Sequence, residues 1–209
     1  ANVTSNNINT RLVALRNGES GVNLSGLNFN IQEQGVLQVG SLLDTYALQT
    51  GGGAGDEAVY GPWGVFLNGS VSVGEKDQTK KEAGYDFDTQ GLTFGVDYRL
   101  NDKQVLGVAL SYGMMENDLH KDGGEIEGSN YTLLFYGTQY ADDYYLDASL
   151  SFGRSSFDQH RNIEYTLSGN TVKQELKSDY NGGEFVMTVG GGYLYSRGAL
   201  TFGPVVRIE

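Results

Sequence analysis

The sequence predicts an all-β fold, a transmembrane antiparallel up-and-down β-barrel. Three observations support this prediction. About seven segments alternate between bulky apolar and small or polar residues, short and long connections take turns along the chain, and tyrosines gather near the short connections. Alternation alone fits a strand against a protein core as well as a strand facing lipid. The other two observations favour a membrane.

The alternation begins at Trp63, after which every second residue is apolar. In this first segment Trp63, Val65 and Leu67 share one face, and Asn68 and Ser70 lie on the other. A strand places successive side chains on opposite faces, so each segment has one bulky apolar face and one small or polar face. The segments span residues 63–73, 92–99, 106–112, 131–136, 146–152, 184–193 and 200–208.

The connections between these segments differ in length in a regular way. Short turns are predicted at residues 101–102, 141–143 and 196–198, and long polar loops over residues 74–86, 113–128 and 154–181. Bacterial membrane barrels separate short turns on one side of the bilayer from long loops on the other in this manner. Tyrosines gather near the predicted short turns, where they would form a girdle at the membrane interface, although soluble hairpins also carry tyrosines beside their turns. These tyrosines are Tyr98, Tyr140, Tyr144, Tyr145, Tyr193 and Tyr195.

Composition excludes several functions. The formal net charge of −12 argues against a nucleic-acid partner, since phosphate binding draws on clustered Lys and Arg. Cysteine is absent, which excludes a disulfide framework, a thiolate metal site and a cysteine nucleophile. No apolar run of about 18 residues is present, so no transmembrane helix is expected. The first residues do not read as a signal peptide, and we expect the chain to be a fragment or a processed product.

The N-terminal region differs from the rest. Residues 7–16 have helical periodicity, with Ile8, Leu12 and Leu15 on one face, and Asn17-Gly18 is a stop signal. Residues 19–36 read as extended and polar. The spacing of apolar residues over 37–49 predicts a second short helix. A glycine-rich flexible linker is predicted to follow at residues 51–55.

Three stretches carry a resemblance to a known family. Residues 63–69 read WGVFLNG, residues 84–99 read GYDFDTQGLTFGVDYR, and residues 105–112 read VLGVALSY. The similarity continues at residues 131–133, 144–147 and 200–204. Over about residues 61–209 the chain resembles the autotransporter β-domain family, and residues 11–16 look like the linker region of that family.

The resemblance implies a twelve-stranded barrel in the bacterial outer membrane, with a helix threaded through its lumen. That helix would join a passenger outside the cell, and the outer-membrane barrel-assembly machinery would insert the barrel. The expected partners are therefore outer-membrane lipid, the chain's own passenger domain and that machinery, with no nucleic acid and no cofactor. The expected division is a lumen helix at 1–18, a linker at 19–60 and the barrel at 61–209.

The sequence departs from the family pattern in one respect. It stops at Glu209, near the seventh strand, and an open sheet in lipid would leave unpaired backbone groups at its edges. We therefore expect an incomplete barrel.

Charged residues on the polar faces of the strands are the candidate site. Strand parity places five of them toward the lumen: Asp97, Arg99, Asp147, Glu184 and Arg207. They would either pair with Arg11 or Arg16 of the predicted helix or simply keep the interior wettable.

Asn6-Asn7 is a second candidate site. It resembles the linker helix of serine-protease autotransporters, which cleave themselves between adjacent asparagines when a side-chain amide attacks its own backbone carbonyl in a fixed geometry. The alternative is a polar helix start with Asn as a cap. His120 and His160 share no metal-ligand spacing and are expected in surface loops, so no metal is predicted.

The sequence thus predicts a non-enzymatic outer-membrane translocator that exports and anchors a passenger. Two alternatives remain. One is a membrane-embedded enzyme, either self-cleaving at Asn6-Asn7 or active on its extracellular loops. The other is a soluble all-β binding domain.

Overall fold

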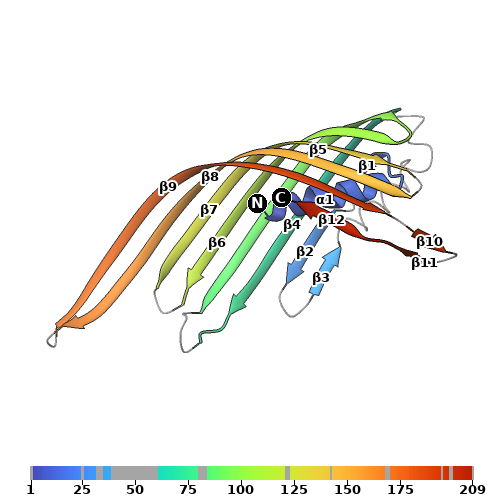
Figure 1. Cartoon of the computed structure of the whole chain (residues 1–209). Coiled ribbons are helices and arrows are strands. Elements are labelled where there is room, and N and C mark those ends of the chain that lie inside the picture. The colour runs from blue at the N-terminus through green and yellow to red at the C-terminus, as the bar shows by residue number, and fades with distance from the viewer. Residues whose placement is uncertain are drawn as a thin grey trace.

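The fold consists of one N-terminal helix and one large, curved antiparallel sheet of long strands (Figure 1). The computed structural model describes residues 2–24, 26–31, 35–38, 61–79, 84–120, 123–141, 143–167, 170–193, 195–197 and 200–208. Among these residues, no helix combines the length and the apolar character needed to cross a membrane.

The body of the sheet is a meander of long strands, each antiparallel to the next. The strands are β4 (Trp63–Lys76), β5 (Tyr85–Asn101), β6 (Gln104–Leu119), β7 (Gly124–Tyr140), β8 (Tyr144–Leu167) and β9 (Asn170–Tyr193). The end of the sheet with the short connections after β5 and β7 is called the turn end, and the opposite end is called the far end. In the described residues the sheet stays open, and the predicted barrel closure is not present.

The long polar loops predicted at the far end are wrong in large part. Within predicted loop 113–128, β6 continues to Leu119 and β7 begins at Gly124. Within predicted loop 154–181, β8 and β9 pair continuously in register, and Figure 1 shows them reaching beyond their neighbours. Charged and polar residues outnumber the apolar ones there, so the sequence shows no continuous alternation, yet backbone pairing holds the strands. His160 consequently lies in β8 and not in a loop, while His120 lies at a turn.

The C-terminal strand predicted over residues 200–208 is broken. β10 (Tyr195–Arg197) and β11 (Leu200–Phe202) form a separate hairpin, and β12 (Val205–Ile208) pairs with β9. The break falls at Gly203-Pro204, where proline has no backbone N–H to donate to a ladder.

Helix α1 (Asn2–Arg16) begins five residues before the predicted start and ends where Asn17-Gly18 predicted. Gly18 has a φ of +86°, a conformation that glycine adopts without steric cost. Its N–H donates to the Leu15 carbonyl at 3.1 Å, and the Glu19 N–H donates to the Ala14 carbonyl at 3.1 Å. This pair of bonds is the Schellman motif, which satisfies the last carbonyls of a helix.

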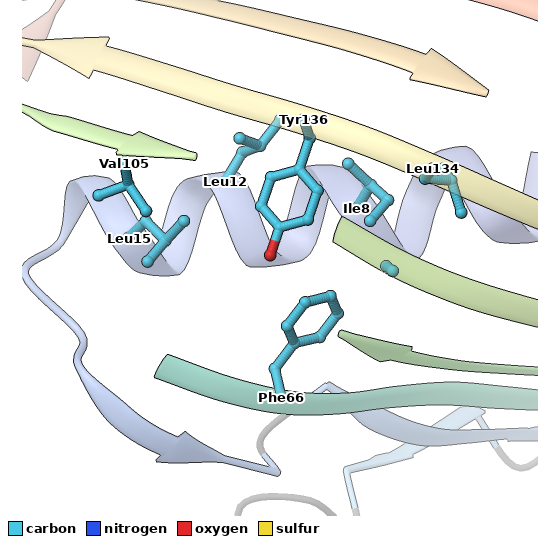
Figure 2. Close-up of a cluster of buried hydrophobic side chains, with 8 residues drawn as sticks. Ile8, Leu12, Leu15, Phe66, Val105, Leu134 and Tyr136 are labelled. Atoms are coloured by element: carbon cyan, nitrogen blue, oxygen red, sulfur yellow. The ribbon is translucent and has the colours of Figure 1, made fainter. Parts of the chain in front are cut away.

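The face of the sheet that carries α1 is called the helix face, and the opposite one the outer face. The core lies between α1 and the helix face of the sheet (Figure 2). The apolar stripe predicted for α1 is confirmed, since Ile8, Leu12 and Leu15 are each at most 2% exposed. The sheet contributes Phe66, Val105, Ala109, Leu134 and Tyr136 to this cluster. The outer face is the reverse, because large apolar side chains such as Leu110 and Phe185 are more than 60% exposed there.

Three short strands follow α1. β1 (Gly21–Asn23) and β2 (Leu27–Ile31) both pair with β4 in parallel, and β3 (Gly35–Gln38) pairs with β2 in antiparallel. Of the second helix predicted over residues 37–49, Leu37 and Gln38 lie in β3, and the rest falls outside the described residues, as does the glycine-rich segment 51–55.

Candidate functional site

The candidate site is the interface between α1 and the helix face of the sheet. α1 offers two adjacent stripes at helical spacing: an apolar stripe of Ile8, Leu12 and Leu15, and a polar stripe of Thr4, Asn7 and Arg11. The members of both stripes are buried. A buried polar stripe requires matched partners, because an unpaired buried polar group is costly.

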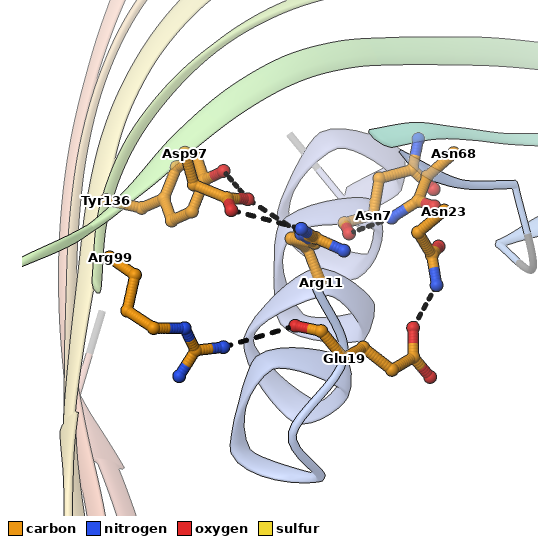
Figure 3. Close-up of polar contacts among 8 residues, drawn as sticks. All are labelled: Asn7, Arg11, Glu19, Asn23, Asn68, Asp97, Arg99 and Tyr136. Carbon is orange, nitrogen blue, oxygen red and sulfur yellow. Dashed lines mark hydrogen bonds and ion pairs between the residues drawn. The ribbon is translucent and has the colours of Figure 1, made fainter. Parts of the chain in front are cut away.

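The centre of the polar stripe is Arg11, which is 0% exposed (Figure 3). Its Nε donates to Asp97 Oδ2 at 2.8 Å and its Nη2 donates to Asp97 Oδ1 at 3.1 Å. The Tyr136 hydroxyl donates to Asp97 Oδ2 at 3.0 Å, and the Arg11 guanidinium lies 5.3 Å from the Phe66 ring centroid. The two-point geometry fixes both the depth and the rotation of the helix.

Gly64 makes room for this pair. A Cβ at that position would lie 2.3 Å from Asp97 Oδ1 and 2.6 Å from Arg11 Nη2. Any side chain on β4 at this point would therefore displace the ion pair.

A second ion pair holds the C-terminal end of the helix. Arg16 pairs with Asp147 of β8, and the Thr138 hydroxyl donates to Asp147 Oδ1 at 2.7 Å. The Arg16 guanidinium also lies 4.0 Å from the centroid of the Tyr145 ring, a cation–π distance. Arg16 therefore fixes the last turn of α1 at the turn end of the sheet.

Neutral polar groups hold the N-terminal half of the helix. Asn7 Nδ2 donates to Thr93 Oγ1 at 2.9 Å, and Asn68 Nδ2 donates to the Asn7 backbone carbonyl at 2.8 Å. The hydroxyls of Thr4 and Ser111 lie 2.9 Å apart, as do those of Thr93 and Ser111. The N-terminal half of α1 is thus bound by side chains from β4, β5 and β6.

The five residues predicted to face inward have different surroundings. Asp97 and Asp147 meet Arg11 and Arg16 as described. Arg207 Nη1 donates to Asn9 Oδ1 at 2.9 Å, so it also contacts α1. Arg99 instead donates to the Tyr140 hydroxyl and, at 3.4 Å, to the Glu19 carbonyl, and Glu184 is half-buried in register opposite Gly153.

Sequence reasoning missed Phe66, Asn68 and Tyr136 as partners of the helix and Thr138 as a partner of Asp147. Tyr136 and Thr138 share the strand parity of Leu134, and it was Leu134 and Tyr136 that blurred the polar face of the segment 131–136. The bulky Leu134 and Tyr136 on the otherwise polar face of this strand were the available signal that another element packs against that face.

The two asparagines of the cleavage hypothesis lie in different environments. Asn6 is exposed, and its carbonyl accepts a hydrogen bond from Thr10 Oγ1 at 3.0 Å. Asn7 is 6% exposed and is held through both its side-chain amide and its carbonyl.

The far end of the sheet carries many acidic side chains on its strands. Partial desolvation and the neighbouring Glu127 raise the pKa of Glu125. A hydrogen bond from Lys177 lowers the pKa of Glu175. Ligand oxygens of Glu116, Glu125 and Glu127 lie within 4.8 Å of one another, a donor type that Ca²⁺ prefers, yet all three are surface groups.

The histidines lie at this same end. His120 Nε2 is 3.0 Å from Asp86 Oδ1, and His160 Nδ1 is 3.6 Å from Glu175 Oε1. Each of the two side chains is paired with a surface carboxylate, His120 at the turn after β6 and His160 within β8.

A buried polar network binds a helix to one face of a sheet whose other face exposes large apolar side chains, and this combination is typical of a membrane-type β-domain. Residues 65–209 match the family model for the autotransporter beta-domain, which is more than half of the chain. The chain therefore belongs to the autotransporter β-domain family, whose members are type V secretion barrels of the bacterial outer membrane and are typically non-enzymatic. No curated protein and no solved structure matches it.

Proposed function

We propose that this domain is the translocator of an autotransporter, in which α1 stands inside the barrel lumen and links a passenger to the outer membrane. The resulting division of the chain is a lumen helix at 1–18, a connecting segment at 19–60 and the barrel wall from residue 61. The observation that carries the proposal is the fully buried Arg11–Asp97 pair. Burying an ion pair costs desolvation free energy, which is offset only when the two groups keep a close and fixed geometry. Such a pair is therefore expected where the helix remains in place.

The direction of the helix supports this role. Thr4 meets Ser111, Arg11 meets Asp97, and Arg16 meets Asp147 near the start of β8. α1 therefore points its N-terminus toward the far end and its C-terminus toward the turn end. A passenger joined ahead of α1 would leave through the far end, the side on which such barrels carry their longer connections.

The sheet dimensions also fit a membrane. A barrel strand needs roughly 9–11 residues to cross a bilayer. Even the shortest of the long strands, β4, has 14 residues. The outer face is apolar near the turn end, with Leu106, Leu110 and Phe135 each more than 45% exposed, and turns acidic toward the far end at Asp88 and Glu116. The strands can thus cross lipid with their turn-end halves and continue outside it.

The test is surface display from the natural gene with an epitope inserted ahead of α1. We expect the epitope to be removed by protease on intact cells, while the β-domain stays in the outer-membrane fraction as a heat-modifiable band. A matched strain with Asp97→Ala should show reduced display, and one with Asp86→Ala should not. An epitope that stays protease-resistant on intact cells, with the β-domain in the soluble fraction, would contradict the proposal and favour a soluble all-β domain.

A second candidate function is cleavage of the linker at Asn6-Asn7. The observation that favours it is the hydrogen bond that Thr10 Oγ1 donates to the Asn6 carbonyl at 3.0 Å, because a donor on the attacked carbonyl stabilises the negative charge that attack develops. The side-chain amide nitrogen of Asn6 would attack the backbone carbonyl carbon of Asn6 and close a succinimide ring. The peptide nitrogen of Asn7 would leave with a proton, and water would then open the succinimide.

Mass spectrometry of the released passenger and of the barrel N-terminus tests this candidate. A new N-terminus at Asn7 that is lost in Asn6→Asp would support cleavage. Identical processing in wild type, Asn6→Asp and Asn7→Asp would exclude it and leave the anchoring role alone.

A further inference from the structure

The helix face of the sheet changes character beyond the N-terminus of α1. Beside the N-terminal half of α1 it presents small polar side chains such as Thr93 and Ser111. Further toward the far end the same face presents apolar and aromatic side chains. Strand parity places them there, because each lies an even number of residues from a helix-face residue of its own strand and the ladders between them keep their register. We call these residues the far-end patch: Phe87, Met115, Ile126, Phe157, Leu176 and Tyr180.

The outer face changes in the opposite sense at the same level of the sheet. Glu116 lies in register with Asp88 on one side and with Glu127 on the other, and Glu127 lies in register with Asp158. Carboxylates therefore occupy matching outer-face positions on four adjacent strands, and Asp179 continues the row on β9. Ionised carboxylates are stable there only in contact with water. A sheet with a polar, wet face and an apolar opposite face is typical of a sheet that packs another element on its apolar side.

The far-end patch is built as a flat platform. The rings of Phe157 and Tyr180 stack with their centroids 5.0 Å apart and their planes at 19°. Gly128 lies in register with Phe157, and a Cβ at that position would lie 2.9 Å from the Phe157 ring and from Met115 Cγ. The glycine therefore lets both side chains lie close against β7.

The far-end patch is also open to solvent in the described part of the chain. Leu176 is 52% exposed and Tyr180 is 50% exposed, and the other four residues are half-buried. All six lie outside the core cluster that packs on α1. A contiguous apolar surface of this kind, rimmed by charged residues, marks an interaction site.

The patch continues the surface that already binds α1. Thr4, near the N-terminus of α1, meets Ser111 of β6, and Met115 lies on the same face of β6 four residues further toward the far end. Four residues of a strand span roughly 13 Å, which about nine residues of helix would cover. The N-terminus of α1 points this way (Figure 1). A segment that precedes Thr4 and keeps the direction of α1 would therefore pass over Met115 and Phe157.

We propose that the far-end patch is the docking surface for the passenger segment that directly precedes α1. That segment would lay apolar side chains on the patch, at every second residue if it is extended or at every third and fourth residue if it is helical. The proposal rests on the proposed function, which places a passenger ahead of α1. The passenger would then leave along a track on the far ends of β6, β8 and β9, and the helix face would bind it on both sides of the α1 N-terminus.

The test is photo-cross-linking in the full-length protein, expressed from its natural gene with Asn6→Asp so that the passenger stays joined to α1. A benzoylphenylalanine residue is placed at Met115 in one strain. The matched control strain carries it at Glu116, the next residue of β6 and one that faces outward. Intact cells that display the passenger are irradiated, and the cross-linked peptides are identified by mass spectrometry. We expect the Met115 position to cross-link to the segment ahead of α1, and the Glu116 position to do so at least several-fold less.

Cross-links from the Met115 position only to other parts of the β-domain, to a second copy or to no peptide at all, in cells that display the passenger, would overturn this proposal and leave the translocator function intact. A passenger that never reaches the surface in the wild type would overturn both.

A second measurement follows the rate at which the passenger emerges. Tyr180→Ser removes an exposed ring from the patch, and Asp179→Ser is the matched control on the opposite face of β9. After pulse labelling, we expect Tyr180→Ser to slow the appearance of protease-accessible passenger several-fold, with an unchanged amount of heat-modifiable barrel. Asp179→Ser and the ring-preserving Tyr180→Phe should match the wild type. Equal rates in Tyr180→Ser and Asp179→Ser would contradict the docking role.

Discussion

The turn-end half and the far-end half of the same strands are stabilised in different ways. In the turn-end half, side chains of the helix face pack on α1 and form buried pairs such as Arg11–Asp97. In the far-end half, β8 and β9 continue to pair, but those side chains that the structure describes there are half-buried or exposed, and His160 and Lys177 pair with Glu175 at the surface. One half therefore has a core and a polar lock, and the other depends on backbone ladders. Changes of similar chemistry should have large effects near the helix and small effects far from it.

The largest effect is expected from Asp97→Ala. This change leaves Arg11 buried without its carboxylate, and breaking a buried pair costs about 3–5 kcal/mol. The measurement is urea unfolding of the barrel in lipid vesicles. Asp86→Ala is the matched control at the far end, where Asp86 is 58% exposed beside His120, and it should change the free energy of unfolding by less than about 0.5 kcal/mol. Equal losses for the two variants would remove the distinction between the halves.

Leu15→Ala is next. Leu15 is 1% exposed against the sheet, and truncating a buried leucine costs about 2–5 kcal/mol. Val13 lies on the same helix at 39% exposure, so Val13→Ala should cost well under half as much in the same unfolding measurement. A larger loss for Val13→Ala would mean that α1 is rotated about its axis so that Val13, and not Leu15, faces the sheet.

Arg16→Gln should have a smaller effect. It removes the charge that Asp147 pairs with and the cation over Tyr145, but both groups keep some solvent contact, so we expect about 1–3 kcal/mol. Hydrogen exchange should localise the loss to the last turn of α1 and the start of β8. If the loss of protection spreads equally to the far end of β8, Arg16 does not act locally.

The smallest effect concerns pH at the far end. The folded-state pKa of Glu125 lies above its unfolded value, so the folded state binds more protons between those two values and stability falls as pH rises through that window. Glu127→Gln should lower the pKa of Glu125 toward its ordinary value and weaken this dependence. The measurement is pH-dependent hydrogen exchange of the β6–β7 end, with Glu75→Gln as control. An unchanged profile in Glu127→Gln would show that the two carboxylates do not interact.

The same comparison explains what the sequence could predict. In the turn-end half, Leu106, Val108 and Leu110 are exposed on the outer face and alternate with the small residues of the helix face, and this alternation reveals the strand. At the far end of β6 no continuous alternation runs along the strand. The continuation of β6 through Asn117 is therefore evident only from its pairing with β7, and a single sequence does not show that pairing.

The candidate site was partly predictable for a similar reason. Strand parity identified Asp97 and Asp147, and helical spacing identified Ile8, Leu12 and Leu15. The partnership of Arg11 with Asp97 depends on how deeply the helix is set and how it is rotated, and neither follows from local periodicity. The parallel pairing of β2 with β4 was missed because Leu27–Ile31 is short, and parallel pairing leaves no turn signal between the strands.

The central claim is that Arg11 and Asp97 hold α1 against the helix face of the sheet. Its most direct test is a double-mutant cycle with Arg11→Met and Asp97→Leu. Unfolding would be measured for the wild type, both single variants and the double variant in lipid vesicles. Each single variant leaves one buried charge unpaired, whereas the double variant leaves none, so we predict that the double variant regains most of the lost stability, with a coupling energy of about 2 kcal/mol or more. Losses that simply add, with a coupling near zero, would show that Arg11 and Asp97 do not meet in the folded protein.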